Sequence, residues 1–381
     1  MLHQKINLLG YDREMLTKFF VERGEQPYRA TQLLKWIHSE GINDFAQMSN
    51  ISKALKEKLS EHCELTFLKT VTEQISTDGT RKWLFGLPEG GAIETVYIPE
   101  AGRATLCISS QVGCILNCRF CHTAQQGFQR NLETSEIIGQ LWAAHRILKE
   151  AGLFCKDGRT ITNVVMMGMG EPLLNFDNVL PALNIMRDDL AYGLSKYRVT
   201  VSTSGVVPGI EQLAKVTDVA LALSLHAPND ALRAELVPLN KKYPLKMVLD
   251  ACKTYIGVDS KRRIMMEYVM LKGINDKPEH AKQLIRVLHG VPCQINLIPF
   301  NPFVGTEYVC SDPDVIHEFS RQLQKGGFIT TVRKTRGQDI DAACGQLAGK
   351  VKDKTQRSAK AASRIETRLK INAVQVEHAV G

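Results

Sequence analysis

Between residues 105 and 332 the chain alternates short apolar runs, suited to β-strands, with segments of helix length. The strand-like runs cover residues 105–112, 163–169, 198–202, 219–225, 264–271, 295–299 and 328–332, and residues 135–148 and 278–289 are two of the helix-like segments. Strands that alternate with helices build parallel sheets or open or closed barrels, whose chemistry gathers at the carboxyl ends of the strands. The sequence therefore predicts an α/β fold with a functional site at that edge.

The first part of the chain has a different pattern, in which apolar residues recur at helical spacing. A turn signal at residues 77–80 and another break at residues 87–91 then separate three strand-like runs. We expect an N-terminal helical accessory domain over residues 1–66, a small antiparallel β extension over 67–104, an α/β core over 105–347 and a basic tail over 348–381. The helical stripes are Met15, Leu16, Phe19 and Phe20, then Leu33, Leu34, Trp36 and Ile37, then Leu55 and Leu59.

Composition limits the classes of protein to which the chain can belong. Hydrophobic residues make up 44% of the 381 residues and charged residues 23%, which is ordinary for a chain that forms a core. There is no apolar run of roughly 18 residues and no signal-peptide pattern at the start, so we expect a cytoplasmic protein without a membrane span. In that reducing compartment the ten cysteines are expected to serve packing, metal binding or catalysis rather than structural disulfides.

Three of these cysteines follow the first predicted strand in the spacing CxxxCxxC: Cys114, Cys118 and Cys121. Thiolates this close repel one another and favour a bound cation. A structural zinc ion usually takes four ligands, and the adjacent His122 could supply the fourth. A [4Fe–4S] cluster also takes cysteine thiolates, and three of them leave one iron open to chelate the amine and carboxylate of S-adenosylmethionine (SAM). The triplet predicts a metal centre on either interpretation.

The triplet, with Phe120 before its last cysteine, resembles the signature of the radical SAM superfamily. The strand–helix alternation is similar to what the partial (β/α)6 barrel of that superfamily would show. Residues 168–172, with the sequence GMGEP, follow a predicted strand and resemble the glycine-rich segment that contacts the methionyl group of SAM. The resemblance implies a [4Fe–4S] cluster on Cys114, Cys118 and Cys121, with SAM as the second cofactor.

Longer motifs resemble one family within this superfamily, the bacterial adenine-C2 methyltransferases with dual specificity for ribosomal and transfer RNA. The resemblance runs from about residue 7 to residue 347, and its motifs include residues 164–173 (VVMMGMGEPL), 202–205 (STSG), 224–227 (SLHA), 296–302 (NLIPFNP) and 333–347 (RKTRGQDIDAACGQL). It implies a SAM pocket formed by Gly170, Glu171, Ser202, Ser224, Leu225, His226 and Asn301.

The resemblance also implies roles for two further cysteines, Cys107 and Cys344. Adenine carbon 2 is electron-poor, so polar methyl transfer fails there, and the family uses two SAM molecules. One methylates Cys344, and the other yields a 5′-deoxyadenosyl radical that takes hydrogen from the S-methyl group. The resulting carbon radical adds to adenine, and Cys107 then attacks the Cys344 sulfur to free the product and leave a transient disulfide. Glu94 matches a glutamate that serves the family as a general base.

The implied partners are 23S rRNA at its peptidyl-transferase region, tRNA at the adenosine 3′ of the anticodon, and an electron donor such as flavodoxin, with no membrane contact. No sequence signal indicates an oligomer, so we expect a monomer. Residues 333–370 carry eleven basic residues against four acidic ones, which predicts contact with phosphates, although a solvated helix face has the same pattern. Two alternatives remain open: a methyltransferase directed to adenine C8, and a non-catalytic zinc or iron–sulfur RNA-binding protein.

Overall fold

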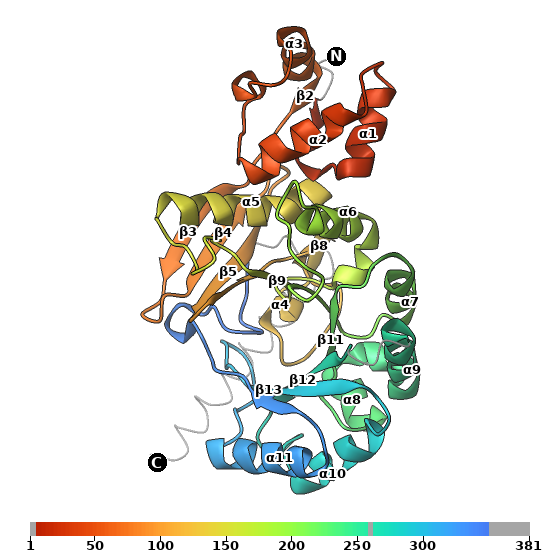
Figure 1. The fold of residues 1–381 in the computed structure, drawn as a ribbon. Helices are drawn as coiled ribbons and strands as arrows, with labels where there is room; N and C mark the ends of the chain where they lie inside the picture. Colours follow the sequence, from red (N-terminus) through yellow and green to blue (C-terminus); the bar gives the residue numbers. More distant parts are fainter. Residues whose placement is uncertain (1–4, 258–261, 350–381) are drawn as a thin grey trace.

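The computed structural model describes residues 5–257 and 262–349. Within the basic stretch 333–370, the residues from Lys350 onward, which include Arg357, Lys360, Arg364 and Arg368, lie outside these ranges. Residues 5–66 form a helical head at one end of the molecule (Figure 1). Its elements are β1 (Ile6–Asn7), η1 (Leu8–Gly10), α1 (Arg13–Val21), α2 (Tyr28–Leu34), η2 (Lys35–Ser39), η3 (Phe45–Gln47), α3 (Lys53–His62) and β2 (Cys63–Glu64).

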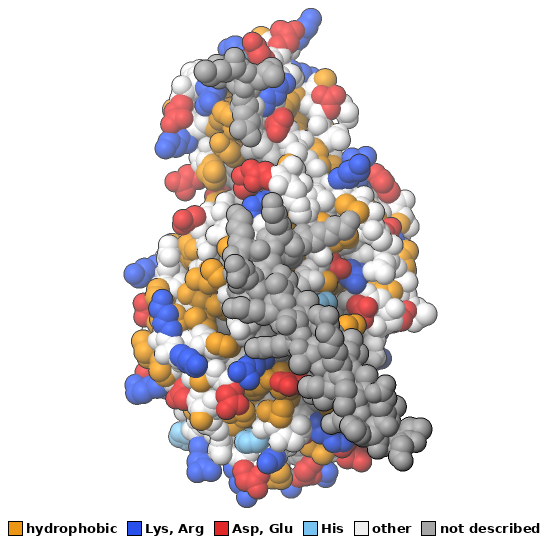
Figure 2. Space-filling view, turned by 180° about the vertical axis from the view of Figure 1, so that it is seen from behind, with side chains coloured by type: hydrophobic (Ala, Val, Ile, Leu, Met, Phe, Trp, Pro, Cys, Tyr) orange, Lys and Arg blue, Asp and Glu red, His pale blue; other side chains and the backbone are white. Residues whose placement is uncertain are grey.

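The head folds as its apolar stripes predicted. Asp12 and Ser52 cap α1 and α3 by accepting hydrogen bonds from backbone N–H groups of the first turn. Parallel pairing of β1 with β2 closes the head by joining its two ends. Every predicted stripe residue is buried except Met15, which is 37% exposed, and Trp36, which is half-buried. Charged side chains of both signs are interspersed over the head in Figure 2, so charge alone does not mark it as a binding surface.

The head is fixed to the rest of the molecule through α5 (Thr134–Glu150) and α6 (Phe176–Arg187). Trp142 donates from Nε1 to the Ile37 carbonyl at 2.9 Å, and its ring lies 3.8 Å from that of Phe67, centroid to centroid. Gly10 meets the start of α5 so closely that a Cβ there would lie 2.5 Å from the Ser135 nitrogen. These contacts are buried, so the head and the core form a packed interface rather than a loose tether.

One ten-stranded sheet organises the rest of the chain, in the order β14-β13-β12-β11-β10-β9-β6-β5-β4-β3. The seven strands from β6 to β14 run parallel, and each matches one of the seven predicted runs. They are β6 (Arg103–Cys107), β9 (Asn163–Met166), β10 (Val199–Thr203), β11 (Ala220–Ser224), β12 (Ile264–Met270), β13 (Cys293–Pro299) and β14 (Thr330–Val332). The expected partial barrel is confirmed, because residues of β5, β6 and β9 to β14 line one cavity while the sheet stays open, with β14 and β3 as its two edges.

Helices between successive strands cover the outer face of this sheet (Figure 1). Besides α5 and α6 they are α7 (Val207–Val216), α8 (Asp230–Leu236), α9 (Leu245–Ile256), α10 (Pro278–Val287) and α11 (Pro313–Lys325), with short turns η4 (Pro172–Leu174), η5 (Pro238–Lys241) and η6 (Gln338–Ile340). Their apolar sides pack on the sheet, which leaves the inner face to line a cavity. Within the described ranges, no helix is both long and apolar enough to cross a bilayer.

The antiparallel element is present, but it extends the main sheet. Its strands are β3 (Lys69–Ile75), β4 (Arg81–Gly86) and β5 (Ala92–Glu100), and β5 pairs antiparallel with β6. The boundary expected at residue 105 therefore falls inside a continuous sheet.

The predicted strand over residues 105–112 is broken in the structure. β6 ends at Cys107, and β7 (Gln111–Gly113) pairs instead with β8 (Phe128–Asn131) across the cysteine triplet. The cause lies in buried hydrogen bonds. Gln140 of α5 accepts from the Ser109 N–H and donates to the Ser109 carbonyl, each at 2.8 Å, so this residue leaves the strand ladder.

Candidate active site

Two adjoining cavities lie against the inner face of the sheet. The strand-end cavity, about 150 Å³, is bordered by the cysteine triplet and by the carboxyl ends of β9 to β13. The lumen cavity, about 700 Å³, extends from there along the sheet toward the amino ends of the strands. Cys121, Asn301, Arg333 and Cys344 are among the residues that line both. A group bound in one cavity therefore lies next to a group bound in the other.

The cysteine triplet lines the strand-end cavity as a single group. Cys114 follows β7, Cys118 lies in the loop, and Cys121 precedes α4 (His122–Gln125). Burial raises the pKa of the Cys118 thiol to about 12, and the negative charge of Cys121 adds to that effect. Uncompensated thiolates are therefore unfavourable here, and a bound cationic centre would remove the penalty. No three His, Cys, Asp or Glu side chains in the described residues converge tightly enough for one metal ion, whereas a cluster binds each thiolate through a different iron.

His122 does not complete a four-ligand zinc set with the triplet in this conformation. Its Nδ1 lies 3.2 Å from the carbonyl oxygen of Gln346. Its ring stacks on Phe303 with centroids 5.0 Å apart and an interplanar angle of 5°. The histidine thus has a structural partner on each side and joins α4 to the segment that carries Cys344.

The strand ends bring six of the seven residues expected to contact SAM onto one cavity wall: Gly170, Glu171, Ser202, Ser224, His226 and Asn301. Leu225 is the exception, because its side chain is fully buried behind that wall. Gly170 has φ +103°, and a Cβ on it would lie 2.6 Å from the Cβ of Gln111. Only glycine allows the chain to turn this closely against β7.

Glu171 presents a buried carboxylate to the strand-end cavity. It accepts hydrogen bonds from the Ser204 N–H at 2.8 Å and from the Leu173 N–H at 3.3 Å. Burial raises the pKa of this carboxyl group to about 7, and the two N–H donors oppose that rise. The group can therefore accept from an amine, and its ionisation falls within the pH range of ordinary binding experiments.

His226 faces the same cavity as a neutral ring. Burial lowers its pKa to about 3. Its Nδ1 accepts from the Val269 N–H at 3.1 Å, which places the proton on Nε2. The residue is strained at φ +58°, and its ring packs edge-on against Phe120 of the triplet at 4.5 Å. Together these contacts hold a rigid N–H donor beside the cysteines.

Cys344 lies where the two cavities meet, on the segment that follows β14. Asn301 donates to the Cys344 carbonyl at 3.3 Å. Two bonds tie the next residues to α4, from the His122 N–H to the Gly345 carbonyl at 2.8 Å and from the Thr123 hydroxyl to the Leu347 carbonyl at 2.6 Å. The position of Cys344 is thus set by the cysteine-triplet loop, more than two hundred residues earlier in the chain.

Cys107 ends β6 and lines the lumen cavity together with Cys344. Both are free thiols. Burial raises the pKa of Cys107 to about 12, and the negative charge of Cys344 contributes to that rise. Two cysteines from opposite edges of the parallel sheet, β6 and the segment after β14, therefore face one space.

Comparisons with known proteins show the family to which the chain belongs. Residues 6–65 match the family described as the N-terminal domain of ribosomal RNA large subunit methyltransferase, and residues 108–285 match the radical SAM superfamily. The chain is 56% identical to proteins named dual-specificity RNA methyltransferase RlmN from Alcanivorax borkumensis and Pseudomonas putida, over 93% of this chain and 93% of each relative. The chain belongs to the RlmN family. A crystal structure of a radical SAM methyltransferase from Sphaerobacter thermophilus also matches, with TM-score 0.82 and 40% identity over 90% of this chain and 99% of that one.

Membership of the RlmN family makes this chain a radical SAM methyltransferase, with a [4Fe–4S] cluster and SAM as its cofactors. The donor set in the strand-end cavity fits both groups. Three soft thiols suit iron–sulfur coordination, and the carboxylate of Glu171 with the rigid N–H of His226 suits a polar ligand.

Glu94 lies apart from both cavities in this RlmN-family chain, since it is in the lining of neither. Its carboxylate is buried, with Oε1 3.4 Å from the Lys82 Nζ and Oε2 accepting from the Ala348 N–H at 2.8 Å. Glu94 therefore anchors the far end of the segment that carries Cys344. Direct contact with a substrate in the lumen cavity would require this anchor to be released.

Sequence reasoning missed four residues that belong to the site. Ser204, Glu267 and Arg333 line the strand-end cavity, and Arg233 is buried directly behind it. Ser204 and Arg333 stand inside quoted motifs, so their positions carried a signal. Glu267 lies mid-strand in an apolar run, and Arg233 lies on a helix like many surface arginines, so nothing local distinguished them.

The carboxylate of Glu171 gives an expected pH dependence for SAM binding. If Glu171 accepts from the SAM amino group as expected, this contact should be strong above pH 7, where the carboxyl group is ionised, and weak below pH 7, where it is protonated. Wild-type protein should bind SAM roughly tenfold more tightly than Glu171→Gln at pH 8. This advantage should shrink as pH falls through about 7 and vanish near pH 5.5. Calorimetric titration of both proteins across pH would measure the ratio, and a ratio independent of pH would contradict the assignment.

Proposed function

We propose that this chain methylates carbon 2 of adenosine in RNA, with Cys344 as the carrier of the methyl group. One observation carries the proposal: Cys107 and Cys344 face a single cavity that adjoins the strand-end cavity. A SAM-dependent enzyme that methylates a nucleophilic atom needs no such pair of thiols. Where the target carbon has no nucleophilic electrons, SAM cannot methylate it directly, and a thiol that first accepts the methyl group from SAM can carry it to that carbon.

Each site residue then has a role. Cys114, Cys118 and Cys121 hold the cluster. SAM binds to the expected contact residues at the strand ends, which are Gly170, Glu171, Ser202, Ser224, His226 and Asn301. When bound, these cofactors supply methylation of Cys344 and then a 5′-deoxyadenosyl radical that takes hydrogen from its S-methyl group. Cys344 carries the one-carbon unit to adenine in the lumen cavity. After the carbon radical adds to adenine, the adduct would return one electron to the cluster and lose its C2 proton, which Glu94 would take once the segment near Ala348 releases it. The Cys107 thiolate would then attack the Cys344 sulfur, so that an S–S bond forms as the S–CH2 bond breaks, and the freed carbon would take up a proton to become the methyl group.

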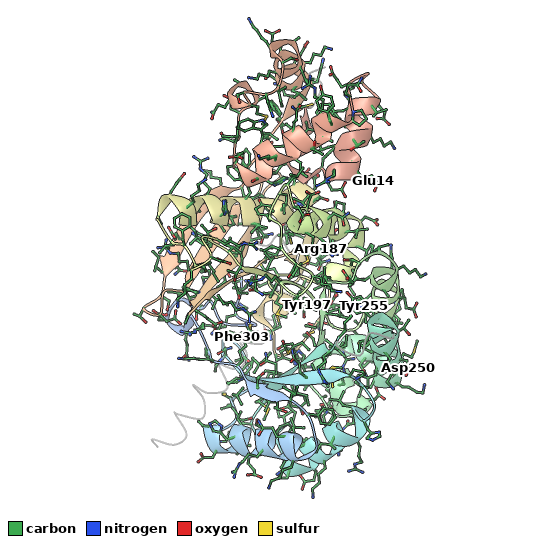
Figure 3. The ribbon with its side chains drawn as sticks, in the orientation of Figure 1. Glu14, Arg187, Tyr197, Asp250, Tyr255 and Phe303 are labelled. Atoms are coloured by element: carbon green, nitrogen blue, oxygen red, sulfur yellow. The ribbon has the colours of Figure 1, made fainter. Side chains whose placement is uncertain are left out.

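The lumen cavity suits a nucleotide of a folded RNA. Its rim includes Arg103 and Arg263 at the amino ends of β6 and β12, both exposed. Tyr197, labelled near the middle of the molecule in Figure 3, borders the same cavity and is 64% exposed. Arginines can neutralise phosphates at the rim, and an aromatic ring can stack on a base turned out of its helix.

The substrates that fit the family name are 23S rRNA, at an adenosine of the peptidyl-transferase region, and tRNA, at the adenosine 3′ of the anticodon. The relatives are named dual-specificity RNA methyltransferases, which supports two RNA classes. The chain acts in the cytoplasm as a monomer, and a flavodoxin-type protein supplies electrons. Residues 1–66 serve as the RNA-binding accessory domain, and residues 348–381 as a basic tail.

Nucleoside analysis tests the reaction directly. The chain, reconstituted with iron and sulfide, would be incubated with SAM, a reductant and unmodified tRNA or a 23S rRNA fragment, and the RNA digested for mass spectrometry. The expected product is 2-methyladenosine. The C8 alternative predicts 8-methyladenosine instead. Absence of any methylated adenosine, with the cluster intact, would overturn the proposed function and favour a binding role.

Arg263 provides a test of the RNA path. Arg263→Ala should weaken RNA binding several-fold and lower the slope of log affinity against log salt concentration by about 1, because one phosphate contact is lost. Arg321→Ala is the matched control, since Arg321 is exposed on α11, pairs with Glu318 and does not line the lumen cavity. Filter binding at several salt concentrations would measure both. An unchanged slope for Arg263→Ala would place the RNA elsewhere.

A further inference from the structure

Arg233 is a fully buried arginine on α8, with a relative exposure of 0%. Its guanidinium group bonds to two successive strand ends. Nε donates to the Leu225 carbonyl at 3.0 Å, and Nη2 donates to the carbonyls of Ser224 at 3.0 Å and Ser204 at 2.8 Å. Nη1 donates to the amide oxygen of Asn240 at 2.9 Å. The planar group thus fixes the segments after β10 and β11 relative to each other, from the side opposite the strand-end cavity.

Ser204 links this guanidinium to the ligand-facing wall. Its carbonyl accepts from Arg233, and its N–H donates to the Glu171 carboxylate at 2.8 Å. Its side chain is also a polar neighbour of Cys118, and both residues line the strand-end cavity. Arg233 is therefore one residue away from a cluster ligand and from the carboxylate that faces SAM, although it lines neither cavity itself.

The charge of Arg233 has no direct counter-ion among the described residues, because all four of its acceptors are neutral oxygens. The Asp230 carboxylate is reached only through Asn240, which donates to it at 2.8 Å. Burial lowers the pKa of Arg233 to about 10, opposed first by the negative charge of Cys118, so the group stays charged at neutral pH. A buried cation is costly unless an anion offsets it. The thiolate-bound cluster beside it is the negative group that can do so.

We propose that Arg233 is a positioning residue for both cofactors. The hydrogen bonds of its guanidinium group hold the strand ends that bind SAM. Its positive charge stabilises the reduced, more negative cluster. This inference rests on the assignment of Cys114, Cys118 and Cys121 as cluster ligands, and it does not depend on which atom of adenine is methylated. Removal of the charge should make the cluster harder to reduce, because net charge near a cluster sets its potential.

Two variants distinguish the effect of the positive charge from the effect of the four hydrogen bonds. Arg233→Gln removes the charge, and Arg233→Lys keeps a charge but cannot donate to all four acceptors. Arg262→Gln is the matched control, since Arg262 also bonds to backbone carbonyls, of Tyr255 at 3.1 Å and Val219 at 3.5 Å, but before β11 rather than after it. Each reconstituted protein would be analysed for iron content, for midpoint potential by redox titration with electron paramagnetic resonance, and for SAM affinity.

The expected result is a more negative midpoint potential for Arg233→Gln than for wild type, Arg233→Lys or Arg262→Gln. Both Arg233 variants should bind SAM roughly tenfold more weakly, because hydrogen bonds of the charged guanidinium group are lost. Equal potentials in Arg233→Gln and Arg262→Gln would overturn the charge role. If Arg233→Gln does not fold, wild-type SAM affinity in Arg233→Lys would overturn the role of the four hydrogen bonds. Loss of the cluster from wild type itself would instead count against the ligand assignment.

Discussion

Cys344→Ala should reduce methylation of RNA to background, a loss of more than roughly 10⁴-fold, because it removes the atom that carries the methyl group. Reductive cleavage of SAM should continue, since Cys344 is not one of the three cysteines assigned to the cluster. Methyl transfer to RNA and formation of 5′-deoxyadenosine would be followed in the same reaction. Cys310→Ala is the matched control, because Cys310 is a half-buried free thiol that lines neither cavity. Appreciable RNA methylation by Cys344→Ala would exclude a carrier cysteine.

Cys107→Ala should stop the reaction at a different stage. Methylation of Cys344 and attack on adenine need only Cys344, whereas release needs a second thiol to attack its sulfur. The variant should therefore accumulate protein joined covalently to RNA, with turnover reduced by more than roughly 10³-fold. Denaturing gel electrophoresis with labelled RNA would reveal the adduct, and nuclease digestion would leave one modified nucleotide on Cys344. Cys344→Ala serves as the control that forms no adduct. Normal turnover by Cys107→Ala would show that release does not use this thiol.

We expect the two variants to differ in outcome because the two cysteines occupy different positions. Cys344 borders both cavities, while Cys107 borders only the lumen cavity. Of the two, only Cys344 therefore borders both the cavity proposed for SAM and the cavity proposed for the RNA base. This placement is what the proposed carrier role requires, and it is the reason to expect that the two thiols are not interchangeable.

The sequence predicted the parallel strands well, because each reads as an apolar run with helices on both sides. It did not predict the end of β6. Residues 105–112 look like one strand, and Gln140 of α5 interrupts it through bonds to Ser109. A glutamine on a helix carries no sign of such a partner in a one-dimensional pattern. Tertiary hydrogen bonds of this kind decide boundaries that local propensity leaves open.

The site was predictable where motifs follow strand ends, as with Glu171 and His226. The site was harder to predict where a residue acts through partners that are distant in the sequence. Glu94 reads as an ordinary strand glutamate, and its bond to the Ala348 N–H spans 254 residues. Arg233 has no feature in the sequence that separates it from a surface arginine, and only burial against three strand-end carbonyls gives it a role.

Labelling of Cys344 in the absence of RNA would show whether this chain carries its own methyl donor. The protein, reconstituted with iron and sulfide, would be incubated with methyl-labelled SAM in the absence of RNA and digested with trypsin. The peptide of residues 337–350 contains Cys344 as its only cysteine. One labelled methyl group is expected on that cysteine by mass spectrometry. An unmodified peptide, in protein whose cluster is intact, would rule out Cys344 as the methyl carrier.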